Sequence, residues 1–440
     1  MPIHYRPSGS SASELAADIE AAVRDGKLQP GSALPPVRTL AADLRLSPAT
    51  VAAAYRDLRI KGIARGQRRA GTRITGAPPV APRPSIVVPA GVRALAAGSP
   101  DPGLLPPFPA MSARSRGPVS PRLYGDAAMH PQLAELAGAR LRADGIDTAH
   151  VAVVGGALDG VERVAGAWLR PGDKVAVEDP GYAPLLDLMA AMDLTAEPVA
   201  LDERGARPEA LAAALARGCR AAVLVPRAQS PTGAAWDADR AASLRSVLAE
   251  HPDVLVVEDD HAADVAGAPA YTVTPGRSRW VTIRSVSKSL GPDLRLAVLA
   301  GDTVSIGRVE GRQSLGTGWV SYLLQEAVVA LWQDPGTSVL LERASAVYAQ
   351  RRAMLLADLA AHRIEAVGQS GFAVWVPVAD ELNVTTAMLG RGWAIAPGER
   401  FRIASPPGVR VGIGTITAEE SARFAADLRD CLARRPRRTD

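Results

Sequence analysis

The sequence is poor in cysteine and has no long apolar run. Cys219 and Cys431 are the two cysteines among 440 residues, and they lie too far apart for a disulfide framework or a zinc-binding spacing. No stretch approaches the roughly 20 uninterrupted apolar residues of a membrane helix. The N-terminal residues also lack the apolar core of a signal peptide. The sequence therefore predicts a globular cytoplasmic protein with no membrane segment and no metal site.

Basic residues are concentrated near the N-terminus. Residues 1–75 hold twelve Lys or Arg against six Asp or Glu, whereas the other 365 residues hold 38 against 40. A small segment with such a surplus suits the phosphate backbone of nucleic acid. A solvated basic surface would have the same composition, so charge alone leaves both interpretations open.

The basic segment has the pattern of three helices and a hairpin. Apolar residues at helical spacing predict helices over 11–25 and 37–44, with a turn rich in proline and glycine between them. A third helix is predicted over 48–62, capped by Ser47. Residues 63–75 have the pattern of a short hairpin with an arginine-rich tip. Together these elements predict a winged helix-turn-helix whose third helix enters the major groove of DNA.

The third helix and the wing supply most of the predicted contacts with double-stranded operator DNA. A recognition helix contacts base edges, and basic wing residues contact phosphates or the minor groove. The wing arginines could instead be an ordinary solvated charged surface. An arginine that opens the second helix is a further candidate for a phosphate contact. The predicted DNA-binding residues are Arg38, Ser47, Ala49, Thr50, Tyr55, Arg65, Arg68, Arg69 and Arg73.

A proline-rich stretch follows this domain. Residues 76–93 contain five prolines, so we predict a semi-rigid linker; an extended strand along a partner, through 86–88, is the alternative. From 94 to the C-terminus at 440, apolar runs alternate with alanine-rich helices, which predicts an α/β domain with a largely parallel central sheet. From about 340, a long helix, two strand candidates and a last helix predict a smaller α+β lobe. The apolar runs are 151–154, 175–177, 221–225, 254–257, 281–283 and 296–299, with 372–376 and 409–413 in the small lobe.

The strongest chemical signal is the segment SVSKSLGPDLRLA at 285–297, which follows a strand candidate. A lysine flanked by small hydroxyl side chains, as Lys288 is, can form a Schiff base with an aldehyde cofactor, although a lone lysine beside serines is usually an ordinary solvated residue. The neighbouring hydroxyls and the guanidinium of Arg295 can hold a phosphate dianion. In VVEDDHAAD at 256–264, an acidic residue at the end of an apolar strand can pair with a pyridinium nitrogen.

These segments bring the chain close to a known family. From about 94 to 432 it resembles the fold-type I aminotransferases. With its N-terminal segment, ELAADIEAAVRDGKLQPGSALPPVRTLAADLRLSPATVAAAYRDLRIKG, it resembles the MocR subfamily of GntR regulators. Seven segments of the larger part match in family order. They are AAGSPDPGLLPPFP, LYGDAAMHPQLAELAGARLRADGI, VVGGALDGVERVAGAWLRPGDKVAVEDPGYAP, QSPTG, VVEDDHAADV, SVSKSLGPDLRLA and PPGVRVGIG.

The resemblance implies pyridoxal 5'-phosphate as the cofactor and a role for each matching residue. Lys288 would bond the cofactor aldehyde, and Asp259 would pair with the pyridinium nitrogen rather than Glu258 or Asp260. Arg410 would bind an effector carboxylate. Each residue also has an ordinary alternative, such as packing, a tight turn or a strand-edge charge. The other implied cofactor-binding residues are the ring neighbours Tyr182 and His261, and the phosphate ligands Gly155, Gly156, Ala157, Ser285, Ser287, Arg295 and Tyr124, the last usually reaching into the neighbouring subunit.

Four residues depart from the family pattern. His261 replaces a tyrosine, Ser230 replaces the asparagine before PTG, Ala228 replaces a histidine common in MocR proteins, and Gly155 replaces a serine. We expect these changes to weaken catalytic turnover more than cofactor binding. We therefore predict a homodimeric transcription regulator that senses an amino-acid-like or vitamin B6-type effector. An active aminotransferase with an appended DNA-binding domain, and a regulator that has lost the cofactor, are the alternatives.

Overall fold

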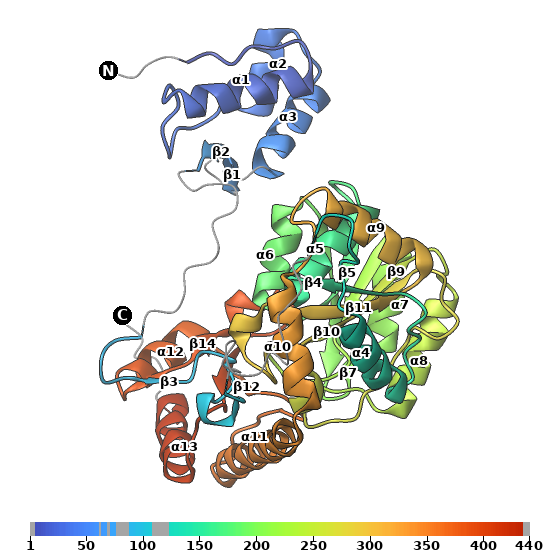
Figure 1. The fold of residues 1–440 in the computed structure, drawn as a ribbon. Coiled ribbons are helices and arrows are strands. Elements are labelled where there is room, and N and C mark those ends of the chain that lie inside the picture. Colours follow the sequence, from blue (N-terminus) through green and yellow to red (C-terminus); the bar gives the residue numbers. More distant parts are fainter. Residues whose placement is uncertain (1–4, 61–62, 68–70, 76–87, 108–122, 434–440) are drawn as a thin grey trace. The chain divides into compact units, whose positions relative to one another are not determined.

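Figure 1 shows the fold of the chain in a computed structural model. The structure describes residues 5–60, 63–67, 71–75, 88–107 and 123–433. It divides into two compact units, the first comprising Met1–Pro84 with Asp187–Thr195 and the second Ser85–Leu186 with Ala196–Asp440. Across these described ranges, no helix combines the length and apolar character needed to cross a membrane. Most of the predicted linker, 76–87, lies outside the described residues.

The first unit contains the three predicted helices and the predicted hairpin. Helix α1 spans Ala12–Arg24, α2 spans Val37–Leu44 and α3 spans Pro48–Ile60. Strands β1 (Ala64–Gln67) and β2 (Gly71–Ile74) pair in antiparallel fashion. The predicted winged helix-turn-helix is therefore confirmed.

Local signals explain where these helices begin and end. Ser11 accepts a hydrogen bond from the N–H of Glu14 at the start of α1, and Ser47 accepts one from the N–H of Thr50 at the start of α3. Arg45, in the left-handed region at φ 55°, ends α2. The helices bury one apolar face each in a shared core. Its fully buried members include Leu15, Ile19, Val51, Ala54 and Leu58.

The second unit is built on an eight-stranded sheet with the order β4-β11-β10-β9-β8-β5-β6-β7. The pairs β5·β8, β8·β9 and β9·β10 are parallel, whereas β11 is antiparallel to both β10 and β4. The prediction of a largely parallel sheet is confirmed, and all six apolar runs form strands. The bounds are β4 Val151–Val154, β5 Lys174–Asp179, β6 Thr195–Asp202, β7 Gly205–Ala206, β8 Ala221–Leu224, β9 Leu255–Asp260, β10 Trp280–Ser285 and β11 Ala297–Gly301.

Helices cover this sheet. Contacts place α5 against α9 and α4 against α10, and these pairs flank the strands in Figure 1. Burial on both faces explains why the strands are continuous apolar runs rather than alternating ones. The helices are α4 Pro131–Ala143, α5 Ala157–Trp168, α7 Pro208–Ala216, α8 Ala238–Ala249, α9 Thr303–Ser314 and α10 Tyr322–Gln333. Helix α6, Ala183–Ala191, begins in this unit, and its residues from Asp187 onward are grouped with the first unit.

A smaller lobe follows the sheet. The long helix α11 leads into a three-stranded sheet with the order β12-β15-β14, while β13 pairs in parallel with β3. One continuous apolar core includes residues of the large sheet, α11 and α13. The elements are β3 Arg93–Ala94, α11 Pro335–Ala361, β12 Ala373–Pro377, α12 Glu381–Leu389, β13 Trp393–Ala394, β14 Ala396–Pro397, β15 Gly408–Gly412 and α13 Ala418–Ala433.

The topology brings distant predicted site residues to one edge of the sheet. Strands β4, β5, β9 and β10 all run in the same direction, so their carboxyl ends meet at that edge. The segments that follow them carry 155–157, 178–182, 259–261 and 285–288. In open α/β sheets, ligands bind outside the carboxyl ends of the strands.

Candidate functional site

Three consecutive carboxylates at the end of β9 have different surroundings. Glu258 accepts hydrogen bonds from the hydroxyls of Thr272 and Thr282 and from a backbone N–H. Asp259 is 5% exposed, and its Oδ1 is buried without a hydrogen-bond partner. Burial, with the nearby charge of Asp260, raises the pKa of Asp259 to about 7. Asp259 is therefore the member of the three with an atom left for a ligand.

Asp260 is held by two arginines. Arg227 donates to both of its carboxylate oxygens at 2.9 and 2.8 Å, and Arg284 Nε donates at 2.9 Å. Arg284 also pairs with Asp144 at 2.7 Å. Although burial acts in the opposite direction, the two arginines lower the pKa of Asp260 to about 2. This network anchors the end of β9, and so it orients the neighbouring Asp259 and His261.

Lys288 lies just beyond the end of β10. Its Nζ donates to the carbonyl of Gly98 and lies 5.6 Å from the ring centroid of Phe372. Burial, with the charge of Arg410, lowers the pKa of Lys288 to about 8. A lysine amine becomes nucleophilic when its pKa is lowered in this way, so Lys288 has the property that Schiff-base formation requires.

A cradle for an anion lies at the start of α5. Gly156 has φ +112° and forms the N-terminal boundary of the helix, whose first N–H groups have no acceptor within the helix. The guanidinium of Arg295 donates to the carbonyl of Gly155 at 3.1 Å. This backbone conformation favours glycine, and a Cβ added at Gly156 would lie 2.8 Å from the end of the Arg295 side chain, which would have to move away from the carbonyl of Gly155.

Other cradle residues are partly engaged. The N–H of Gly155 already donates to Asp159 at 2.7 Å, which leaves the N–H groups of Gly156 and Ala157 for an anion. Ser285 is buried and accepts from the N–H of Ser287. The hydroxyl of Ser287 is buried without a partner. Of the predicted phosphate residues, Gly155, Gly156, Ala157 and Arg295 lie together at the start of α5, while Ser285 ends β10 and Ser287 follows it at the same edge of the sheet. The hydroxyl of Ser287 is the one among them that still lacks a hydrogen-bond partner.

Two aromatic rings face the same region. Tyr182, after β5, and His261, after β9, have ring planes within 7° of parallel and centroids 6.5 Å apart. Flat heteroaromatic rings stack on such faces. Burial, with the charge of Lys288, lowers the pKa of His261 to about 4, so its imidazole is neutral near pH 7. A neutral imidazole carries one N–H donor, whereas a tyrosine would offer a hydroxyl.

Arg410, on β15, completes the group from the small lobe. It donates to Ser230 at 3.2 Å and to the carbonyl of Ala96, and its Cζ lies 4.6 Å from the ring centroid of Phe401. Its Nε is buried without a partner. Burial lowers the pKa of Arg410 to about 10, so the guanidinium keeps its charge near neutral pH. Ser230 contacts this arginine directly, a contact that sequence spacing did not indicate.

The unpartnered atoms test whether pyridoxal phosphate fits. Asp259 Oδ1 suits a protonated ring nitrogen, Ser287 Oγ suits a phosphate, and Arg410 Nε suits a carboxylate. A buried polar group without a partner is costly, so three such atoms around one lysine indicate a ligand that satisfies them. The residues present therefore fit this cofactor together with a carboxylate-bearing molecule.

Two residues stand apart from this group. Tyr124 is 94% exposed, and its ring lies edge-on to Trp319 with centroids 5.8 Å apart, so it takes no part in the cradle of its own chain. Ala228 is buried at φ 54°, and its N–H donates to Ser370 at 2.7 Å. A Cβ added at Gly371 would lie 2.7 Å from the Ala228 methyl group, so this position is filled by packing.

The DNA-binding predictions have mixed outcomes. Arg38, Ser47 and Ala49 are exposed and Thr50 is partly exposed. The hydroxyls of Ser47 and Thr50 lie 2.8 Å apart at the start of α3. Arg73 is half-buried and donates to the carbonyl of Gly31 at 2.8 Å. Arg68, Arg69 and the side chain of Arg65 lie outside the described residues.

Tyr55 does not face outward, and its prediction as a DNA contact is wrong. It is 1% exposed, and its hydroxyl donates to the carbonyl of Pro35 at 2.7 Å. The side chain therefore packs α3 against the segment before α2. Its helical position is shared with the buried Val51 and Leu58, and this i, i+3, i+4 relation was the available sign that it belongs to the core.

Comparisons with known proteins agree with both units. The family Bacterial regulatory proteins, gntR family, matches residues 11–74, and the family Aminotransferase class I and II matches residues 110–428. A solved kynurenine aminotransferase of Pyrococcus horikoshii has a TM-score of 0.71 at 20% identity, covering 78% of this chain and 91% of that one. This likeness shows the fold. Fold and site thus define a DNA-binding domain joined to an aminotransferase-like domain.

Full-length relatives have the same two parts. The vitamin B6 salvage pathway transcriptional repressor PtsJ of Salmonella typhimurium is 37% identical over 97% of this chain and 99% of its own length. The HTH-type transcriptional regulator TauR of Rhodobacter capsulatus is 25% identical over 89% of this chain and 90% of its own. The chain belongs to the MocR subfamily of GntR transcriptional regulators.

Proposed function

We propose that this regulator binds pyridoxal 5'-phosphate at Lys288 and senses an amino-bearing effector there. The observation that carries the proposal is the buried, unpartnered Asp259 Oδ1 in the same site as a lysine of lowered pKa. The relation to PtsJ, named for the vitamin B6 salvage pathway, supports an effector of vitamin B6 type, and Arg410, with its unpartnered Nε, supports an amino-acid-like one.

Different residues of the site would bind different parts of the cofactor. When bound, pyridoxal phosphate supplies an aldehyde that bonds amines and a ring that accepts electron density. Asp259 would keep the ring nitrogen protonated. Arg295, Ser287 and the first N–H groups of α5 would hold the phosphate, and Tyr182 would stack on the ring. His261, whose ring plane is parallel to that of Tyr182, would contact the cofactor ring.

An amino-bearing effector would place its carboxylate at Arg410, whose Nε lacks a partner, and its amine near Lys288 Nζ. Arg410 belongs to the small lobe and Lys288 to the large sheet domain, so effector binding would change the contacts that hold the two lobes in place. The response can be only as large as the difference in effector affinity between the two states.

We also infer that the protein works as a cytoplasmic homodimer on double-stranded DNA. Tyr124 is 94% exposed, which leaves it available to the phosphate site of a second subunit. Further exposed apolar side chains are Leu123, next to it in the chain, and Leu315 and Leu323, four residues on either side of Trp319, whose ring Tyr124 contacts. Two copies of residues 1–75, each joined to its domain through the linker 76–93, would read a repeated site.

DNA binding is tested by removing one exposed charge from α2. Arg38→Ala should weaken binding to DNA from upstream of the protein's own gene by about tenfold, with the salt slope smaller by about 1, because one phosphate contact is lost. Fluorescence anisotropy at several salt concentrations measures both. Arg24→Ala is the matched control, since Arg24 lies in α1 with its side chain 75% exposed. Equal losses in both variants would contradict the contact, and wild-type protein without salt-dependent binding would overturn the DNA function.

Capture of the cofactor should depend on pH. The pKa of Lys288 is lowered to about 8, so the neutral, nucleophilic amine accumulates as pH rises through that value. The capture rate of cofactor-free protein should rise roughly twentyfold between about pH 6.5 and pH 8.5. Stopped-flow absorbance after mixing with pyridoxal phosphate measures this rate. A midpoint near the ordinary lysine value of 10.5 would show that the site leaves Lys288 unperturbed.

A further inference from the structure

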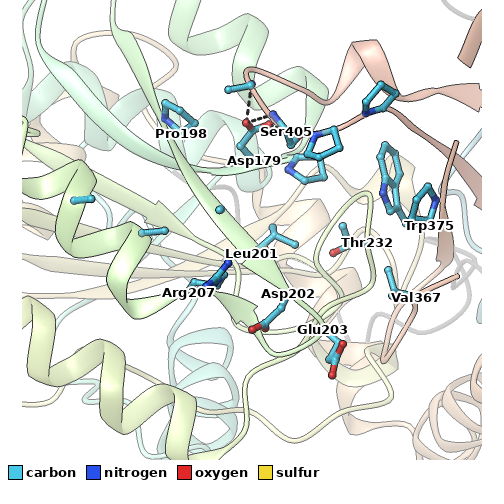
Figure 2. Close-up of a pocket in the computed structure, with 18 of the residues that line it drawn as sticks. Asp179, Pro198, Leu201, Asp202, Glu203, Arg207, Thr232, Val367, Trp375 and Ser405 are labelled. Atoms are coloured by element: carbon cyan, nitrogen blue, oxygen red, sulfur yellow. Dashed lines mark hydrogen bonds between the residues drawn. The ribbon is translucent and has the colours of Figure 1, made fainter. Parts of the chain in front are cut away.

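A single carboxylate at the edge of the site ties the large domain to the small lobe. Asp179, the last residue of β5, is 4% exposed. Its Oδ1 accepts from the N–H of Ile403 and the hydroxyl of Ser405, at 2.9 and 2.8 Å. Its Oδ2 accepts from the N–H groups of Ala404 and Ser405, both at 2.7 Å. We call these four hydrogen bonds the Asp179 clasp. Figure 2 shows Asp179 beside Ser405, with dashed lines for those of the bonds whose partners are drawn.

The segment after the clasp carries Tyr182. The N–H of Gly181 donates to the carbonyl of Phe401 at 2.7 Å. Ala183 packs in a small apolar cluster with Phe401 and Trp375, separate from the main core. The residues on both sides of Tyr182 are thus in contact with the same part of the small lobe, and the position of that part sets the position of the ring.

The same cluster supports Arg410. The ring of Phe401 lies under its guanidinium, with 4.6 Å between Cζ and the ring centroid. Trp375 is its neighbour across β12 and β15. Ala96, a further member of the cluster, accepts from its NH2 group. The cluster therefore joins the residue predicted to stack on the cofactor with the residue predicted to bind the carboxylate.

A cavity lies beside the clasp, and it borders the small-lobe residues that bind Asp179. The cavity has a volume of about 730 Å³, and Asp179, Ser405 and Trp375 line it (Figure 2). Closely packed interiors resist displacement, but the 404–407 segment borders open space on this side. Within the small lobe the segment is held by the N–H of Val378, which donates to the carbonyl of Pro407, and by Arg402, which donates to the carbonyl of Ser405. Its position relative to the large domain depends on the four hydrogen bonds to Asp179.

We propose that Asp179 is a positioning residue that couples Arg410 to Tyr182. The clasp and the apolar cluster connect residues 403–405 of the small lobe to the segment that carries Tyr182, so that the two segments move together. A carboxylate that binds Arg410 therefore changes the position of the Tyr182 ring. In the same way, a ring stacked on Tyr182 changes the position of the Arg410 side chain. The proposal rests on the proposed function for the roles of these two residues, whereas the mechanical link is a property of the cofactor-free chain.

The link is tested by hydrogen exchange of the full-length protein without cofactor. Asp179→Ala removes the acceptors of residues 403–405, so those amides exchange faster in any case. The informative amide is Gly181, whose acceptor on Phe401 the change leaves in place. Its exchange should rise about tenfold, as should that of 409–411, the change expected when one strong hydrogen bond is lost nearby. Unchanged exchange at Gly181 and 409–411 would overturn the proposal.

Two further variants separate the clasp from general destabilisation. Asp202→Ala is the matched control, because Asp202 lines the same cavity but pairs with Arg240 of α8 rather than with the small lobe. It should leave exchange at Gly181 within about twofold of wild type. Ser405→Ala removes one of the four hydrogen bonds and should shift Gly181 in the same direction as Asp179→Ala, by less. If Asp179→Ala fails to fold, Ser405→Ala decides, and no shift there overturns the proposal.

A binding measurement then connects the link to the site. Titration with pyridoxal phosphate should give about a tenfold weaker Kd for Asp179→Ala, although Asp179 is not among the cofactor-binding residues, and a Kd within about twofold of wild type for Asp202→Ala. Equal Kd values for Asp179→Ala and wild type would overturn the coupling. If wild-type protein bound no pyridoxal phosphate, the proposed function would fail, and the exchange experiment would still decide on the clasp.

Discussion

Lys288→Ala should remove the visible absorbance that pyridoxal phosphate gives the wild-type protein. Covalent attachment needs an amine, and Lys288 is the lysine that the fold places beside Asp259, Arg410 and the start of α5. Its pKa of about 8 leaves a useful fraction of neutral amine near physiological pH. Asp259 and Arg295 are unchanged in the variant, so the cofactor would still bind without a covalent bond and would wash out on gel filtration.

The matched control is Lys174→Ala. Lys174 lies at the start of β5 and pairs with Glu197 at 2.9 Å, so its loss should leave the absorbance unchanged. Spectra recorded before and after gel filtration, with borohydride reduction followed by peptide mapping, identify the attached residue. Absorbance that persists in Lys288→Ala would assign the attachment to another amine. Wild-type protein that stays colourless with excess cofactor would favour a regulator that has lost pyridoxal phosphate.

Tyr55→Ala should unfold much of the DNA-binding domain, whereas Tyr55→Phe should be mild. The ring is 1% exposed within the core of the first unit, and truncation of a buried aromatic side chain costs about 3–5 kcal/mol. That is a large share of the free energy of unfolding of a domain this small. Phenylalanine keeps the ring and loses only the hydrogen bond to Pro35, about 1 kcal/mol.

The pair of variants distinguishes a core role from a DNA contact. Hydrogen exchange of α1 and α3 amides in the full-length chain reports the stability of this unit, and anisotropy reports DNA affinity. For a core residue, Tyr55→Phe retains DNA affinity and Tyr55→Ala loses it together with exchange protection. If Tyr55→Phe left the exchange protection of α1 and α3 unchanged but bound DNA much more weakly, Tyr55 would be a DNA contact and not only a core residue.

Local sequence signals were sufficient for most of the secondary structure. Ser11 and Ser47 cap helices through contacts within four residues, and the strands of the large sheet are short apolar runs because both faces are covered. Such signals depend on neighbours in the chain, so a single sequence exposes them. The position of Lys288 after a strand was readable in the same way, and the family resemblance then supplied its expected role.

Tertiary contacts decided which of several similar residues remains free for chemistry. Glu258, Asp259 and Asp260 are adjacent carboxylates, and they differ because Thr272, Arg227 and other residues far along the chain satisfy two of them. Charge did not predict which carboxylate keeps an open atom, because that depends on which distant groups fold against each residue. Tyr55 is a different case, since its helical spacing from Val51 and Leu58 already indicated the core face.

The sequence by itself therefore determined the two-part architecture, the helix-turn-helix and the lysine at the end of a strand. The tertiary structure decided that Asp259, Ser287 and Arg410 each have a buried atom without a hydrogen-bond partner. It also decided that Asp179 accepts hydrogen bonds from the small lobe. The physical reason is that a buried polar atom is satisfied or left open by its neighbours in space. Those neighbours come from strands and loops that no local pattern relates.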